Sequence, residues 1–62
     1  FYSMLMQFTQ GTTPTRLHLV HTHNEDLVDE AIRMGYIIEI RKNEYGEPVY
    51  AITPLGKSVR DH

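Results

Sequence analysis

The sequence predicts an α+β domain in which three helices lead into a two-stranded hairpin and one further helix closes the chain. Residues 25–34 carry apolar and charged side chains on opposite sides of a helix. Residues 36–41 and 49–52 are rich in β-branched and aromatic side chains and enclose a polar segment with glycine and proline, which is typical of a hairpin. Thr53 and Pro54 then indicate a helix start, because threonine caps a free backbone N–H and proline fits the first helical position.

Size and composition limit the class of protein. The 62 residues fit a single domain over residues 1–62, and because the chain begins at Phe1 rather than Met, we expect a domain cut from a longer protein. A composition of 40% apolar and 23% charged residues is ordinary for a globular domain, and the formal net charge is −2. Cysteine is absent, which excludes a disulfide framework, and no apolar run approaches the ~18 residues of a membrane span. We therefore expect a cytoplasmic protein with no membrane partner.

The first part of the chain predicts two short helices. The first covers residues 1–8, where apolar side chains recur at helical spacing, at Phe1, Met4, Leu5 and Phe8. A Thr-Pro pair at residues 13–14 repeats the start signal described above, so a second helix is expected over residues 14–21. In that helix Leu17 and Val20 lie on one side and are expected to face the core.

The third helix, residues 25–34, is the clearest amphipathic segment. Asn24 is expected to cap its first turn, and the acids that follow favour the positive end of the helix dipole. Asp29 and Arg33 are four residues apart and are expected to pair. Gly35 is expected to end the helix in a left-handed conformation. The apolar stripe of the helix consists of Leu27, Val28, Ala31 and Ile32.

The hairpin and the last helix supply the remaining core residues. Ile38 and Ile40 alternate with charged side chains, so both are expected on the buried face of the first strand. Residues 42–48 are expected to form the turn. In the last helix, Leu55 and Val59 are expected to face the core.

Two short motifs enclose the hairpin. Gly35-Tyr36-Ile37 leads from the third helix into it, and Tyr50-Ala51-Ile52-Thr53-Pro54-Leu55-Gly56 leads out of it. In this order and spacing the chain resembles a winged helix-turn-helix domain, especially the small bacterial, phage and archaeal ones, from about Thr13 onward. The segment 13–35 is a few residues shorter than usual, which implies compact helices. The resemblance implies binding of double-stranded DNA in transcription or replication control, with the hairpin as the wing.

The resemblance also implies which residues contact DNA. The third helix would lie in the major groove and the wing would touch phosphates or the minor groove. The start of the second helix presents free N–H groups that suit a phosphate. The candidate nucleic-acid-binding residues are Thr13, Thr15, Arg16, His23, Asn24, Arg33, Arg41, Lys42, Asn43 and Tyr45, with Asp26, Asp29 and Glu30 as further exposed positions on the third helix.

The charge of the third helix leaves two functions open. Its exposed side carries four carboxylates and one guanidinium group, and duplex DNA repels such a surface. We therefore expect DNA contacts mainly from the start of the second helix, the following turn and the wing. The alternative is a winged-helix protein-interaction or dimerisation module that binds a basic protein partner through residues 25–34. Taken one by one, the four acids of this helix need no partner, because acidic groups commonly cap the first turn and keep the exposed side in water.

Residues 1–8 indicate a contact with a second copy. Phe1, Tyr2, Met4 and Met6 make this segment apolar on nearly all sides. Exposed apolar patches mark contacts, so a homodimer through residues 1–8 is one hypothesis. The other is that truncation of the chain exposes the segment.

Catalytic and metal sites are not expected. His18, His21 and His23 form a His-x-x-His-x-His pattern close to Asp26, and these residue types suit zinc or nickel. Without cysteine, and with the histidines divided between a helix and a turn, we interpret them as ordinary surface and half-buried side chains. We expect no cofactor and no enzymatic activity, because the chain has neither a recognisable triad nor a glycine-rich phosphate loop.

Overall fold

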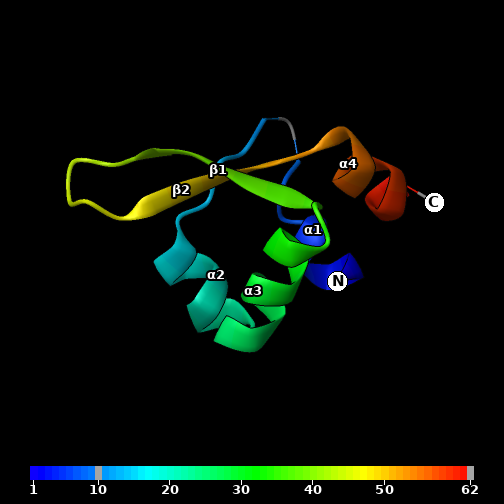
Figure 1. The fold of residues 1–62 in the computed structure, drawn as a ribbon, viewed down its shortest axis with the longest axis horizontal. Coiled ribbons are helices and arrows are strands. Elements are labelled where there is room, and N and C mark those ends of the chain that lie inside the picture. Colours follow the sequence, from blue (N-terminus) through cyan, green and yellow to red (C-terminus); the bar gives the residue numbers. More distant parts are fainter. Residues whose placement is uncertain (10, 62) are drawn as a thin grey trace.

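The computed structural model describes residues 1–9 and 11–61. This part of the chain forms four helices and one antiparallel sheet of two strands, so the expected α+β class is confirmed. The elements are α1 (Tyr2–Leu5), α2 (Arg16–Thr22), α3 (Glu25–Arg33), β1 (Ile37–Lys42), β2 (Pro48–Ile52) and α4 (Pro54–Asp61). Figure 1 shows α2 and α3 beneath the hairpin, the hairpin turn projecting past α2, and α4 at the opposite end. No helix in the described residues is long and apolar enough to cross a membrane.

One core joins all these elements. Its buried side chains come from the N-terminal segment, from α2 and α3, and from both strands, and Val59 of α4 packs against them. The N-terminal segment contributes three of the largest groups, although its regular helix is short. The buried residues of this cluster are Met4, Leu5, Phe8, Leu19, Val28, Ala31, Ile37 and Tyr50.

The first helix is shorter than the sequence predicts. It ends at Leu5 instead of continuing to Phe8, because the chain tightens into a turn in which the Phe8 N–H donates to the Leu5 carbonyl at 3.1 Å. This turn brings Phe8 into the core, where it is 2% exposed. Phe1 packs edge-on against Tyr36 with ring centroids 5.3 Å apart.

The expected start of the second helix is wrong by two residues. Thr15, not Thr13, caps α2, and its side chain accepts a hydrogen bond from the His18 N–H at 3.2 Å. Pro14 lies outside the helix because its carbonyl accepts the Tyr50 N–H at 3.0 Å, and Thr15 forms a one-residue bridge with Val49. The segment is thus held extended along the outer edge of β2, and this long-range pairing overrides the local start signal.

The buried face of α2 also differs from the expected one. Leu17, expected in the core, is 66% exposed, whereas Leu19 is completely buried. Val20 is half-buried against the core.

The expected boundaries of the third helix are confirmed. The Asn24 side chain accepts a hydrogen bond from the Leu27 N–H at 2.7 Å, and Gly35 follows the helix with φ of 81°. Of the apolar stripe, Val28 and Ala31 are buried and Leu27 is half-buried. The fourth member, Ile32, is 36% exposed at the edge of the stripe.

The hairpin forms as expected, but its buried face is different. Ile37 is 2% exposed, whereas Ile38 and Ile40 are 55% and 47% exposed, so the assignment of these two residues to the core is wrong. Ile37 pairs with Ile52, which places the inward face one residue earlier than the alternation predicts. The register then shifts between Glu39 and Arg41, as in a β-bulge, and Ile40 has no partner in β2.

Asn43 organises the hairpin turn, residues 43–47. Its side-chain oxygen accepts hydrogen bonds from the Tyr45 and Glu47 N–H groups at 2.9 and 3.0 Å. Its own N–H donates to the Glu47 carbonyl at 2.9 Å, and Gly46 has φ of 78°. The turn is therefore closed by hydrogen bonds of the backbone and of one side chain.

The Thr-Pro pair after β2 begins the last helix as predicted. The Thr53 hydroxyl accepts the Gly56 N–H at 3.0 Å and lies 2.6 Å from the Gly35 carbonyl, to which it can donate. The Thr53 N–H donates to the Tyr36 carbonyl at 2.9 Å. Leu55, expected to face the core, is instead 53% exposed. Gly56 takes the inward position.

Gly56 is buried because the backbone before β1 passes directly over it. A Cβ atom at this position would overlap the carbonyl oxygen of Tyr36 and lie 2.7 Å from the Ile52 side chain. Its N–H is meanwhile held by Thr53. Only glycine therefore lets α4 pack this closely against the start of the hairpin.

The leucine pair of α2 tests the observed register. We expect Leu19→Ala to lower the free energy of unfolding by about 2–4 kcal/mol, because it leaves a cavity in the core. We expect Leu17→Ala to change it by less than about 0.5 kcal/mol, because that side chain already faces solvent. Urea denaturation followed by circular dichroism measures both variants. Equal losses, or a larger loss for Leu17→Ala, would show that α2 turns a different face to the core.

The close approach at Gly56 gives a second prediction. We expect Gly56→Ala to destabilise the fold by about 1–3 kcal/mol, because backbone must move to admit the added methyl group. Ser58→Ala, at an exposed position of the same helix, is the control and should stay within about 0.5 kcal/mol of the parent. A Gly56→Ala variant with an unchanged melting temperature would contradict the observed packing.

Candidate nucleic-acid interface

Arg16, at the start of α2, is bound to neighbouring side chains. Its guanidinium group donates to Asp29 at 2.7 Å and to the Tyr50 hydroxyl at 3.3 Å, and it lies 3.5 Å from Glu25. The hydrogen bonds that Arg16 donates to Asp29 and Tyr50 raise the pKa of Arg16 above its usual value, and its side chain is only 25% exposed. This predicted phosphate contact therefore joins α2, α3 and β2 instead of pointing into solvent.

Two further arginines are also paired. Arg33 forms an ion pair with Glu30 one turn earlier in α3, and this contact raises the pKa of Arg33. Arg60 of α4 pairs with Asp61 at 2.7 Å and donates to the Phe8 carbonyl at 2.8 Å. Half of the six lysines and arginines in the chain are thus already engaged with carboxylates.

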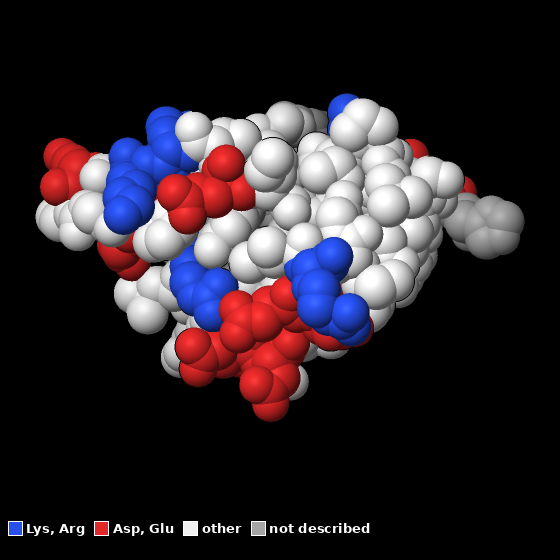
Figure 2. Space-filling model, in the orientation of Figure 1, with Lys and Arg blue, Asp and Glu red and all other residues white. Residues whose placement is uncertain are grey.

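The exposed side of α3 is an acidic surface. Figure 2 shows its carboxylates as a red patch bordered by blue. The expected pair between Asp29 and Arg33 does not form, because Asp29 binds Arg16 and Arg33 binds Glu30. Even with both arginines counted, the surface keeps a net negative charge. The acidic surface consists of Glu25, Asp26, Asp29 and Glu30.

The hairpin carries two cations that form no ion pair with any carboxylate of residues 1–9 and 11–61. Arg41 and Lys42 are both exposed at the end of β1, and Tyr45 in the turn is 78% exposed. Figure 2 shows the blue atoms of the hairpin apart from the patch over α3. Acidic side chains also lie on the hairpin, at Glu39, Glu44 and Glu47.

The remaining predicted contacts have local structural roles. Thr15 and Asn24 use their side-chain oxygens to cap helices. His23 ends α2, and its Nε2 atom lies 3.1 Å from the Gln7 amide nitrogen. Thr13 is half-buried in the loop before α2. Thr15 lies across β2 from Arg41, since both pair with Val49, whereas His23 and Asn24 lie where α2 ends and α3 begins.

The histidine pattern forms no metal site in the part of the chain that the structure describes. No group of three or more metal-ligating side chains comes together there. His18 and His21 are exposed on α2, and His23 lies at its end.

Sequence reasoning missed Tyr50 as part of this region. Its ring is 4% exposed in the core, while its hydroxyl receives a hydrogen bond from Arg16. The two residues are 34 positions apart, so neither spacing nor periodicity could indicate the contact. Comparison of the chain with protein-family models, curated proteins and solved structures finds no match. Its function therefore has to be inferred from its own residues.

The contact between Arg16 and Asp29 can be measured with a double-mutant cycle. We expect Arg16→Gln and Asp29→Asn to show a coupling free energy of about 0.5–1 kcal/mol, since the pair is partly exposed and solvent weakens it. Asp26→Asn, on the same helix, is the control and should show no coupling to Arg16→Gln. Equal coupling free energies for Asp29 and Asp26 would mean that Arg16 interacts with the overall negative charge of α3 and not with Asp29 in particular.

Proposed function

We propose that the chain is a winged-helix domain that contacts double-stranded DNA through its hairpin, in the control of transcription or replication. The order of the elements supports this proposal, since α2 and α3 precede a hairpin that projects beyond them (Figure 1). The motif residues support it as well. Gly35 has the left-handed conformation that leads into β1, and Thr53 links the end of β2 to α4.

The observation that supports DNA binding is the presence of two cations on the hairpin that form no ion pair in the described residues. Arg41 and Lys42 are adjacent, exposed and free of carboxylates within ion-pair distance in the described residues. Tyr45, close to them in the turn, can pack against a sugar or a base. Arg16 and Arg33 pair with carboxylates of α3, which stays acidic, so in this proposal the hairpin is the contact and α3 faces away from the duplex.

This mode of binding has a definite electrostatic signature. The logarithm of the binding constant falls with the logarithm of salt concentration by about 0.9 per phosphate neutralised. Two hairpin cations therefore give a slope of about −2. Insertion of a basic helix into the major groove would give a much steeper dependence. The proposed contact is accordingly weak and has little sequence preference.

A second candidate is a protein-interaction module that binds a basic partner. The acidic surface of α3 favours it, because four carboxylates lie on this one helix and Figure 2 shows them as one patch. A homodimer through residues 1–8 also stays a prediction, with Tyr2 and Met6 as its exposed apolar side chains at 59% and 43%. Neither function involves catalysis.

Fluorescence anisotropy with a random-sequence duplex tests the DNA proposal. We expect binding at low salt, a slope of about −2 in the salt dependence, and loss of binding when Arg41→Ala and Lys42→Ala are combined. Asp26→Asn is the control, because it changes the charge of α3 without touching the hairpin, and it should bind at least as well as the parent.

Two results would contradict the proposal. One is the absence of salt-sensitive binding at low ionic strength, and the other is equal binding by the parent and the combined hairpin variant. If a basic peptide then bound the parent and bound Asp26→Asn more weakly, the second candidate would replace the first.

A further inference from the structure

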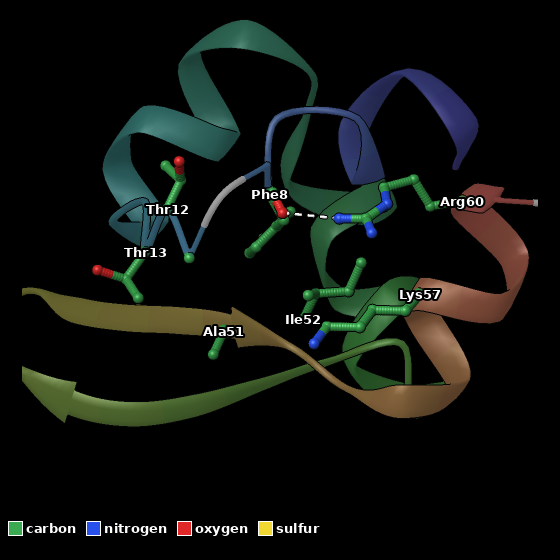
Figure 3. Close-up of a pocket in the computed structure, with 8 residues that line it drawn as sticks. Phe8, Thr12, Thr13, Ala51, Ile52, Lys57 and Arg60 are labelled. Atoms are coloured by element: carbon green, nitrogen blue, oxygen red, sulfur yellow. Dashed lines mark hydrogen bonds between the residues drawn. The ribbon is translucent and has the colours of Figure 1, made fainter.

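A pocket lies at the end of the molecule opposite the hairpin turn. It has a volume of about 360 Å³, within the range of small-molecule sites. Figure 3 shows it between α4, β2 and the loop that precedes α2. The residues that line it are Phe8, Gly11, Thr12, Thr13, Ala51, Ile52, Lys57 and Arg60.

The pocket has an apolar floor. Phe8 is buried beneath it, and the half-buried side chain of Ile52 comes from β2, whereas the Ala51 side chain points away on the other face of the strand (Figure 3). Thr12 and Thr13 form the wall on the loop side. A ligand that rests on this floor therefore needs an apolar body.

Two cations from α4 form the opposite wall. Figure 3 shows Lys57 extending along Ile52, and Arg60 reaching to the carbonyl of Phe8. The Arg60 side chain is only 16% exposed and is held on its other side by Asp61 at 2.7 Å. No carboxylate in the described residues forms an ion pair with Lys57.

The charges of the pocket restrict the charge of the ligand that can bind. Arg60 and Asp61 balance each other, so the ammonium group of Lys57 leaves the pocket with one net positive charge. A neutral ligand that covered this ammonium would remove water from it without replacing the hydrogen bonds, which is unfavourable. A dianion would carry more charge than the pocket compensates and would approach Asp61. A monoanion fits both constraints.

We propose that this pocket binds a small organic carboxylate. The carboxylate group accepts hydrogen bonds from the Lys57 ammonium and from the unused N–H groups of Arg60. The apolar body of the ligand lies on Phe8 and Ile52. The site lies away from the hairpin turn and from its cations Arg41 and Lys42, so the proposal does not depend on DNA binding.

The ligand preference can be tested by NMR with benzoate, benzamide and acetate as probes. We expect benzoate to shift the backbone amide signals of Thr13, Ala51 and Ile52 in a saturable manner at millimolar concentration. Benzamide has the same ring without the charge, and acetate has the charge without the ring, so both should bind about tenfold more weakly or worse. Equal shifts with benzamide or acetate, or no saturable shift with benzoate, would overturn the proposal.

Variants of Lys57 test the anion contact. We expect Lys57→Met to weaken benzoate binding by about tenfold or more, because it removes a charge-assisted hydrogen bond but keeps the apolar stem. Lys57→Arg should retain binding, and Lys42→Met, which removes a cation from the distant hairpin, should leave it unchanged. Unchanged affinity in Lys57→Met, or equal losses in Lys57→Met and Lys42→Met, would overturn the assignment. If Lys57→Met did not fold, loss of binding in Lys57→Arg would also count against it.

Discussion

The close contact between the start of the hairpin and the start of α4 is the constraint on which the rest of the structure depends. Thr53 donates its backbone N–H to the Tyr36 carbonyl, and its hydroxyl caps α4 through the Gly56 N–H. Because Gly56 has no side chain, the Tyr36 carbonyl can lie directly against it. The two ends of the hairpin and the last helix are thereby locked at one point.

This junction gives a physical meaning to the motifs that enclose the hairpin. Gly35 turns the chain out of α3 with a positive φ, and its carbonyl lies within hydrogen-bond distance of the Thr53 hydroxyl. The threonine of the second motif thus contacts the glycine of the first across 18 positions of sequence. The two motifs are halves of one structural unit, which explains why the spacing between them equals the length of the hairpin.

Features set by neighbouring residues could be predicted from the sequence, and features set by distant contacts could not. The cap at Asn24 and the start of α4 at Pro54 each depend on side chains within a few positions. The predicted start of α2 is wrong because the Pro14 carbonyl accepts a hydrogen bond from the Tyr50 N–H, and no local pattern indicates that bond. The predicted inward face of β1 is wrong because the pairing of β1 with β2 places Ile37 in the core. The candidate site follows the same rule, since the exposed hairpin cations could be predicted but the role of Arg16 could not.

The irregularity at Ile40 also affects how the molecule meets other strands. One edge of β2 is occupied by the segment around Thr15, but β1 forms the open edge of the sheet. An open edge with two exposed isoleucines would normally invite a strand from another molecule and promote aggregation. The bulge breaks the regular row of backbone groups, and the charges of Glu39, Arg41 and Lys42 lie along the same strand. The distortion therefore makes this edge a poorer template for a strand of another molecule, although Ile38 and Ile40 are exposed on it.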